Sequence, residues 1–207
     1  REEASAWYHI SVPKDHSIES WPLIIYLHGG GYNNGSADQM VALGTLNPLK
    51  EKVILLFPNH LKGWWSHPIE MAYFLDTLAN VMTRWRINPK RIYLMGDSMG
   101  GNGTWGVGSH CTEIFAALSP GAGDYQPFYD IPINNLVKKP VRISHGTKDA
   151  VVPIAGARNA FEILKKLKAP VEMHEIDCGH ALPFEDHNAR IAWFLQFENL
   201  QIFDLPT

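Results

Sequence analysis

The chain has 207 residues, of which 45% are hydrophobic and 19% are charged, and its formal net charge is −3. This is ordinary globular composition, and the length predicts a single domain over residues 1–207 with a sizeable core. The charge balance gives no electrostatic support for nucleic-acid binding, and no apolar run approaches the ~20 residues of a membrane span.

Three short apolar runs predict strands near the start of the chain, at 7–12, 23–27 and 53–57. The second run leads directly into a histidine and three glycines, from His28 to Gly31. Glycine-rich loops after an early strand donate a backbone N–H to the oxyanion hole of serine hydrolases, where it stabilises the charge of a tetrahedral intermediate.

We therefore predict Gly30 or Gly31 as one oxyanion-hole donor, and we place Tyr32 at the substrate. His28 is interpreted as structural, because it comes before the candidate nucleophile described below. In hydrolases of this class the catalytic histidine comes last in the chain.

Trp64 and Trp65 follow the end of the third predicted strand. They are interpreted as a wall of the substrate pocket, and a buried structural pair is the alternative, since aromatic side chains are common in pockets and in cores. Apolar residues at helical spacing then predict a helix over 69–85.

The most informative stretch runs from 87 to 101. A turn is predicted at 87–90 and an apolar strand at 91–95, followed by Gly96-Asp97-Ser98-Met99-Gly100. The Gly-x-Ser-x-Gly pattern between a strand and a helix is typical of a nucleophile elbow, a sharp turn that exposes a serine hydroxyl to a base. Ser98 is the candidate nucleophile, and the N–H of Met99 is the candidate second oxyanion-hole donor.

The remaining strands are predicted at 115–118, 141–144 and 171–176, and helices at 153–167 and 184–197. Asp149 follows the second of these strands and His180 follows the third. The chain order Ser98, Asp149, His180 matches the triad order of α/β-hydrolases, with histidine as base and the carboxylate orienting it.

The roughly fifty residues between Ser98 and Asp149 leave no room for a separate lid domain. They include the loop 121–139, in which Tyr125 and Phe128 are expected to border the pocket, with surface packing as the alternative.

Several motifs together resemble serine esterases of the α/β-hydrolase superfamily, most of all the group of feruloyl esterases, polyhydroxybutyrate depolymerase-like proteins and phospholipase/carboxylesterases. The matching motifs are Leu27-His28-Gly29, Asn88-Pro89-Lys90-Arg91-Ile92-Tyr93, the Gly-x-Ser-Met-Gly-Gly run from Gly96 to Gly101, the run from His145 to Pro153, and Gly179-His180. Asp97 departs from the residues that are commoner before the serine.

The alternation of predicted strands and helices implies a doubly wound, mostly parallel sheet with helices on both faces, and the resemblance implies that this is the α/β-hydrolase fold. Because no lid domain is expected, we predict an open cleft and hydrolysis of short-chain or aromatic acyl esters, small or carrier-borne, through an acyl-enzyme. No cofactor and no metal is implied, and the acyl group, the alcohol and the oligomeric state stay open.

Rival interpretations have less support. A peptidase on the same fold usually has an extra domain, and a non-catalytic binding module usually lacks a triad member. Gly-Asp-Ser-Leu lipases and trypsin-like proteases have a different residue order. Asp177 and Asp124 are the competing candidates for the acid.

The other polar candidates are interpreted without a catalytic role. His60, His67 and the pair Asp186-His187 are interpreted as loop and surface residues, and Cys111 and Cys178 as free thiols. The sequence starts at Arg1 and not at Met, so a cleaved signal peptide and a secreted or periplasmic location are compatible with it, and the compartment stays open.

Overall fold

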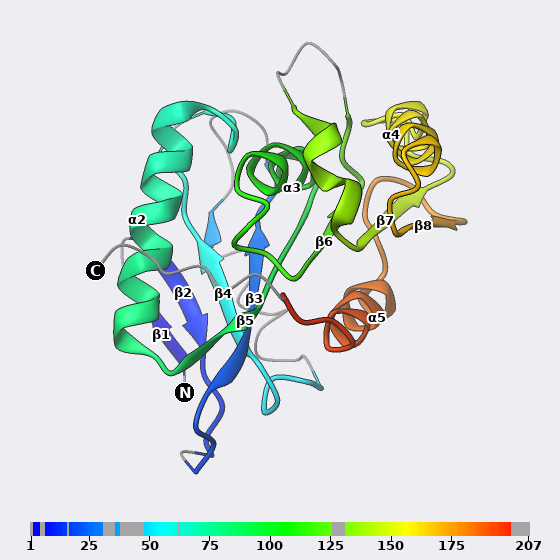
Figure 1. Ribbon diagram of the computed structural model, residues 1–207. Coiled ribbons are helices and arrows are strands. Elements are labelled where there is room, and N and C mark those ends of the chain that lie inside the picture. The colour runs from blue at the N-terminus through cyan, green and yellow to red at the C-terminus, as the bar shows by residue number, and fades with distance from the viewer. Residues whose placement is uncertain are drawn as a thin grey trace.

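The computed structural model describes residues 2–4, 7–15, 17–30, 36–37, 48–61, 63–125 and 131–199. Within these ranges eight strands form one sheet in the order β1-β2-β4-β3-β5-β6-β7-β8 (Figure 1). The strands are β1 (Glu2–Ala4), β2 (Tyr8–Ser11), β3 (Trp21–Leu27), β4 (Ile54–Pro58), β5 (Ile87–Asp97), β6 (Ala117–Gly121), β7 (Val141–Gly146) and β8 (Val171–Ile176).

The sheet is mostly parallel, as predicted. All pairs from β4 through β3, β5, β6 and β7 to β8 are parallel, and the two antiparallel pairs, β1 with β2 and β2 with β4, lie at one edge. The central strands have continuous apolar sequences because both faces of a parallel sheet are covered. In β4 all five residues are buried, and in β3 every residue after Trp21 is buried.

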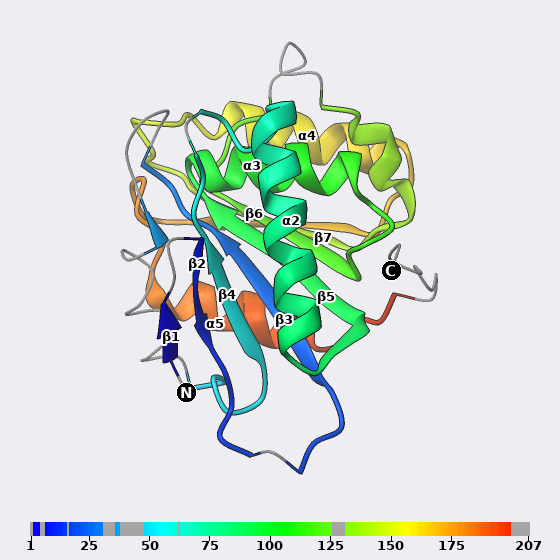
Figure 2. The same cartoon turned by 90° about the vertical axis from the view of Figure 1, so that its left-hand side faces the viewer.

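Helices cover both faces of the sheet (Figure 2). They are α2 (Pro68–Arg84), α3 (Met99–His110), α4 (Ala155–Lys166) and α5 (Phe184–Phe194), with a 3-10 helix η3 (Ile133–Lys138). One core cluster contains Phe74 of α2, Trp105 of α3 and Leu164 of α4, whereas a second contains Ile191 and Phe194 of α5. The two clusters lie on opposite faces, so the prediction of a doubly wound sheet is confirmed.

The prediction of a turn at 87–90 is wrong, because β5 already begins at Ile87. Trp21 of β3 faces Ile87, but Leu23 faces Ile92, so the two strands change register between these pairs. The amide of Trp21 also donates to the carbonyl of Arg86 at 2.8 Å. Pairing with β3 therefore fixes the two ends of this Asn-Pro segment, and residues 88–91 lie in the irregular stretch between the paired Ile87 and Ile92.

Other predicted bounds shift by a few residues. The helix predicted at 153–167 covers Ala155–Lys166, and the one predicted at 184–197 ends at Phe194. The strand predicted at 115–118 is observed at Ala117–Gly121, and the strand at Val171–Ile176 has the predicted bounds.

The parallel arrangement decides where the site lies. Strands β3, β5, β7 and β8 run in the same direction, so the residues after Leu27, Asp97, Gly146 and Ile176 meet at one edge of the sheet. The crevice outside these carboxyl ends is where open α/β sheets bind ligands. No helix in the described part of the chain is long and apolar enough to cross a lipid bilayer.

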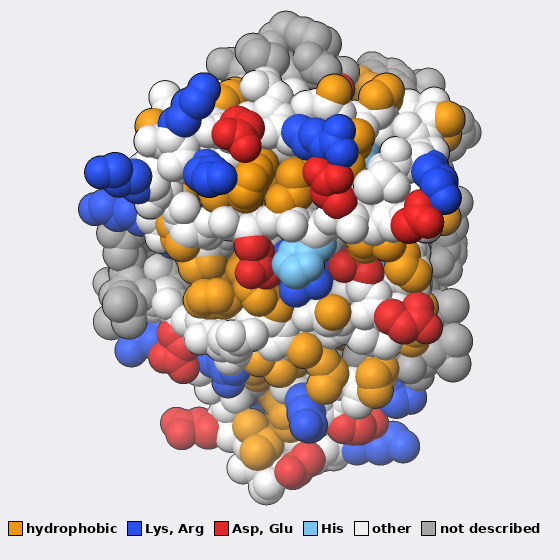
Figure 3. All heavy atoms as spheres, turned by 90° about the vertical axis from the view of Figure 1, so that its right-hand side faces the viewer, with side chains coloured by type: hydrophobic (Ala, Val, Ile, Leu, Met, Phe, Trp, Pro, Cys, Tyr) orange, Lys and Arg blue, Asp and Glu red, His pale blue; other side chains and the backbone are white. Residues whose placement is uncertain are grey.

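Basic and acidic side chains are interspersed on the face beside α4, β8 and α5 (Figure 3). The guanidinium of Arg158 binds the Glu175 carboxylate at 2.7 and 2.8 Å. Lys148 pairs with Asp177 at 2.6 Å. Among the described residues, this face therefore presents a mixed surface and not an extended patch of one charge.

Candidate active site

Ser98 lies on a sharp turn between β5 and α3. Its φ is 59° and its ψ is −121°, a left-handed conformation that a residue with a side chain rarely adopts. Two backbone hydrogen bonds support this turn: the Ser98 amide donates to the Gly121 carbonyl at 3.0 Å, and the Ser98 carbonyl accepts from the Asn102 amide at 3.0 Å. Strain of this kind persists only where the surrounding structure over-determines it, and it is concentrated at functional sites.

The glycines on either side of the serine are required by close packing. A Cβ on Gly96 would lie 2.6 Å from the carbonyl oxygen of Leu27, and one on Gly100 would overlap that same oxygen. The start of α3 therefore passes directly against the end of β3. Only glycine at these two positions permits the turn that presents Ser98.

The side chains of Ser98, His180 and Asp149 form a continuous chain of hydrogen bonds. His180 Nε2 lies 2.9 Å from Ser98 Oγ, and His180 Nδ1 lies 2.8 Å from Asp149 Oδ2. Because a carboxylate only accepts, Nδ1 has the proton and Nε2 is free to accept the hydroxyl proton of Ser98. This arrangement can raise the nucleophilicity of the serine in the way that general-base catalysis requires.

Asp149 is held by donors on both oxygens. Oδ1 accepts from the amides of Val151 and Val152, each at 2.9 Å, and Oδ2 also lies 3.4 Å from Nε2 of His145. Burial by itself would raise the pKa of Asp149, but the hydrogen bonds from His180 and from the two amides lower it below its ordinary value. The carboxyl group is therefore kept ionised where it orients the imidazole.

The two competing candidates for the acid make their contacts elsewhere. The Asp177 side chain is 77% exposed and pairs with Lys148 on the surface. The Asp124 amide donates to Asn102 Oδ1 at 2.7 Å, at the end of β6. The hydrogen bond of His180 goes to Asp149.

The predicted oxyanion-hole residues adjoin Ser98 where the structure describes them. A Cβ on Gly29 would lie 3.2 Å from Ser98 Cβ, so this loop passes directly over the nucleophile, and Gly30 follows with a φ of 116°. Met99 is the first residue of α3, where a backbone N–H has no intrahelical partner. Gly31 and Tyr32 lie outside the described residues.

A cleft of about 790 Å³ opens at these residues. Beside Ser98 and His180 it is lined by apolar side chains and by a few polar groups. They include Trp64, Met99, Asn102, Val151, Val152, Leu182, Tyr26, Asp97 and His187. The site can therefore take an apolar group of small-molecule size next to the serine hydroxyl.

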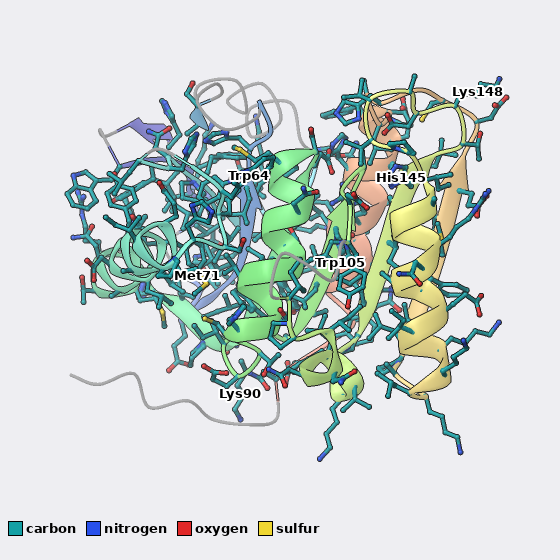
Figure 4. The ribbon with its side chains drawn as sticks, turned by 90° about the horizontal axis from the view of Figure 1, so that it is seen from above. Trp64, Met71, Lys90, Trp105, His145 and Lys148 are labelled. Carbon is teal, nitrogen blue, oxygen red and sulfur yellow. The ribbon has the colours of Figure 1, made fainter. Side chains whose placement is uncertain are left out.

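The adjacent residues Trp64 and Trp65 have different surroundings in the structure. Trp64 lines the cleft, whereas Trp65 is 1% exposed and belongs to the core. Trp65 Nε1 donates to the carbonyl of His28 at 3.2 Å, so the ring supports the glycine loop from below. In the view from above, Trp64 and His145 lie on opposite sides of α3 (Figure 4).

Of the other two predicted wall residues, Tyr125 lies in the described part of the chain and does not line the cleft. Tyr125 is 6% exposed, and its ring packs against Trp105 at 6.2 Å between centroids. Its contacts are those of a core residue, so neither the pocket role nor the surface packing expected from the sequence holds for Tyr125. Phe128 lies outside the described residues.

His28 is completely buried beneath the glycine loop. Its Nδ1 donates to the carbonyl of Gly29 at 2.8 Å, and its ring packs edge-on against Trp65 at 5.2 Å between centroids. Burial lowers the pKa of His28 to about 4. The contacts are those of a neutral structural histidine.

The interpretation of Asp186 and His187 as surface residues is wrong. Each is 7% exposed, and both lie on the buried face of α5. His187, together with Arg190 of the same helix, contacts Asp97, the residue before the candidate nucleophile. Sequence reasoning missed this cluster.

A helical pattern was available as a signal for it. His187, Arg190, Ile191 and Phe194 have the spacing i, i+3, i+4 and i+7 of one helix face, and the last two residues are apolar. Polar residues on the same helix face as buried apolar residues indicate buried polar contacts.

Both cysteines are free, as expected, and Cys111 is buried whereas Cys178 is half-buried. Within the described residues, no group of three or more histidine, cysteine, aspartate and glutamate side chains is placed to hold a metal ion.

Comparison with known proteins places this geometry in a known architecture. No family profile matches the sequence. Solved structures superpose over most of the chain: a thermostable esterase has a TM-score of 0.77 and 22% identity and covers 92% of this chain. Thermogutta terrifontis esterase 2 phosphorylated by paraoxon has a TM-score of 0.73 and 16% identity over 91%. A ferulic acid esterase has a TM-score of 0.70 and 15% identity over 90%.

The fold is that of the α/β-hydrolases. This chain spans 59% of the thermostable esterase, 87% of the Thermogutta enzyme and 88% of the ferulic acid esterase. Among curated proteins, an esterase of Fusarium pseudograminearum (strain CS3096) is 29% identical over 85 residues, which are 39% of this chain and 26% of that protein. The predicted resemblance is confirmed at the level of the fold.

Proposed function

We propose that the chain is a serine carboxylesterase in which residues 1–207 form one catalytic domain. Ser98 is the nucleophile, His180 the general base and Asp149 the acid that orients it. The observation that carries the proposal is the chain of hydrogen bonds from Asp149 through His180 to Ser98, at 2.8 and 2.9 Å, at the side of the cleft.

In the acylation step, Ser98 Oγ attacks the carbonyl carbon of the ester while its proton passes to Nε2 of His180. The carbonyl oxygen becomes an oxyanion, which the N–H of Met99 and an N–H of Gly30 or Gly31 stabilise. The imidazolium then gives its proton to the leaving alkoxide oxygen. The C–O bond to the alcohol breaks, and the acyl group stays on Ser98.

Deacylation repeats these steps with water. A water molecule that loses its proton to Nε2 of His180 attacks the acyl carbon, and the proton returns to Ser98 Oγ as the acid leaves. Asp149 remains ionised throughout and stabilises the imidazolium, in agreement with its lowered pKa. This chemistry requires no metal or cofactor.

The comparisons support the same reaction class. Several structures with this fold are described as esterases, and one of them carries a phosphoryl group from paraoxon. Paraoxon is an organophosphate, and reagents of this kind phosphorylate activated serines. We infer that Ser98 of this chain has the same reactivity.

The lining of the cleft favours short-chain or aromatic acyl esters. Trp64, Met99, Val151 and Leu182 form an apolar surface beside the serine, and the crossover between β6 and β7 is too short for a lid domain. A substrate on a bulky carrier such as a polysaccharide can reach an open cleft. We therefore propose a feruloyl- or acetyl-esterase-like role.

The decisive test is the substitution Ser98→Ala together with labelling by a fluorophosphonate. The variant should lose about 10⁴- to 10⁶-fold in kcat on p-nitrophenyl acetate, and the wild type should be labelled at Ser98 alone. A variant with full activity, or a label on another residue, refutes the proposal. A peptide amide run in parallel distinguishes an esterase from a peptidase.

A further inference from the structure

Asp97 lies at the centre of a largely buried polar cluster beneath the elbow, and its side chain, 19% exposed, also borders the cleft. Its Oδ2 accepts from the hydroxyl of Tyr26 on β3 at 2.6 Å and lies 2.5 Å from Nε2 of His187 on α5. Its Oδ1 accepts from the guanidinium of Arg190 at 2.6 Å. Three donors from two distant elements therefore hold the residue that precedes Ser98.

The charged groups of this cluster have several hydrogen-bond partners, as a buried ion pair requires. Arg190 is completely buried, and its remaining N–H groups donate to Ser119 Oγ at 2.8 Å, to the Gly96 carbonyl at 3.2 Å and to the Ser119 carbonyl. Burial would raise the pKa of Asp97, but the charge of Arg190 and the hydrogen bond and charge of His187 bring it far below its ordinary value. Asp97 is therefore a permanent carboxylate acceptor.

His187 also has a second contact, on the other side of its ring. Its Nδ1 lies 3.0 Å from the carbonyl oxygen of Pro183. Pro183 is the residue immediately before α5 and lies three positions after His180. A carbonyl and a carboxylate both act as acceptors, so a ring with a proton on each nitrogen donates to both of them, in opposite directions.

We propose that His187 is a positioning residue that ties the nucleophile elbow to the loop of the base. Through Asp97 it contacts the chain next to Ser98, and through Pro183 it contacts the chain next to His180. The bridge holds the 2.9 Å contact between Ser98 Oγ and His180 Nε2. This inference rests on the proposed roles of Ser98 and His180.

The physical reason is the steep dependence of rate on geometry. A displacement of about 1 Å at a reacting group costs on the order of 100-fold in rate. The strained backbone at Ser98 also needs support from its neighbours. His180 itself is on a loop between β8 and α5, and its side chain is 28% exposed, so packing by itself restrains it less than a core residue.

Two substitutions separate the two contacts of the ring. His187→Asn retains a donor near the position of Nδ1, toward Pro183, and His187→Gln retains one near Nε2, toward Asp97. A bridge needs both ends, so each variant should lose about 10- to 100-fold in kcat on p-nitrophenyl acetate, with KM within about threefold of wild type. The rate of fluorophosphonate labelling of Ser98 should fall in parallel.

Ser144→Ala is the matched control. Ser144 is completely buried and donates to Asp186 Oδ1 at 3.0 Å, so it ties α5 to β7 without touching Asp97, His187 or Pro183. This variant should lower the melting temperature but leave kcat within about twofold of wild type. The rates are expressed per fluorophosphonate-reactive site, so loss of folded protein does not count as loss of activity.

Three outcomes overturn the positioning role. The first is that both His187 variants retain the kcat of the Ser144→Ala control. The second is that only one of them loses activity, which would mean that a single contact of the ring is enough to position the site. If His187→Gln does not fold, Asp97→Asn tests the bridge from its other end, and wild-type kcat in that variant is the third refuting outcome. Failure of wild-type Ser98 to react with the fluorophosphonate refutes the proposed function itself, and the positioning role with it.

Discussion

His145 lies directly against Asp149, with its Nε2 3.4 Å from Asp149 Oδ2, and both side chains are completely buried. The same nitrogen donates to the carbonyl of Val152 at 2.8 Å. His145 is the penultimate residue of β7, so this contact closes the loop that presents Asp149 to His180. A second histidine thus supports the proposed acid without touching the proposed nucleophile.

Removing this support should weaken both the loop and catalysis. His145→Ala leaves the Val152 carbonyl without its donor and creates a cavity, which should cost about 2–4 kcal/mol of unfolding free energy and about tenfold in kcat. His145→Gln, which keeps a donor near Nε2, should recover part of both losses. Equal kcat values in the two variants, measured on folded protein, contradict the role of this hydrogen bond.

Asp149→Asn should lose about 10⁴-fold in kcat with its fold intact, because the amide favours the wrong tautomer of His180. Asp177→Asn is the matched control, since Asp177 is exposed and pairs only at the surface with Lys148. Its kcat should stay within about twofold of wild type. A crippled Asp177 variant beside a mild Asp149 variant would reverse the assignment of the acid.

The neighbouring tryptophans should respond in opposite ways. Trp65→Ala removes a buried core ring and should cost about 3–5 kcal/mol in unfolding free energy measured with urea. Trp64→Ala opens the cleft wall and should raise KM for methyl hydroxycinnamates about three- to tenfold, with a smaller loss of stability. Unchanged KM for aromatic and acetyl esters in the Trp64 variant would remove this residue from the substrate site.

The unfolding free energy should fall as the pH is lowered from about 6.5 to about 4. The pKa of His28 is about 4 in the folded protein against 6.5 for the ordinary value, so the unfolded chain binds this proton first. The contribution of His28 is therefore complete above pH 6.5 and is lost as the pH falls toward 4, by up to about 3 kcal/mol.

The measurement is urea unfolding across this pH range for wild type and for His28→Asn, which keeps a donor near Nδ1. The variant should be less stable at neutral pH and should lose less stability on acidification. Parallel pH curves for the two proteins would show that His28 does not titrate on unfolding.

The cleft that the described residues form is open, so it should prefer short acyl chains. The kcat/KM for p-nitrophenyl esters is expected to fall from acetate and butyrate to decanoate and palmitate, because the described residues form an open cleft and no enclosed apolar channel for a long chain. The rate should also follow simple saturation through the solubility limit of each ester. A jump in rate above that limit, or a preference for palmitate, would identify a lipase with a mobile cover.

Local sequence patterns were sufficient for the fold class. The segments that form β3 and β4 are uninterrupted runs of apolar residues, as expected for strands that are covered on both faces. Apolar residues at helical spacing predict α2. The Gly-x-Ser-x-Gly pattern identifies Ser98 because the turn needs small residues that are close to the serine in the sequence. Chain order then points to Asp149 and His180, since parallel strands bring the residues after their carboxyl ends to one edge.

The sequence does not decide which side chains are buried around that edge. Trp64 and Trp65 are adjacent and chemically identical, yet one lines the cleft and the other supports the glycine loop. Asp97, His187 and Arg190 are residue types that usually lie on the surface, because burying an isolated charge costs too much free energy. Their burial depends on mutual pairing across about ninety positions of sequence, and only the packing of α5 against the sheet brings those partners together.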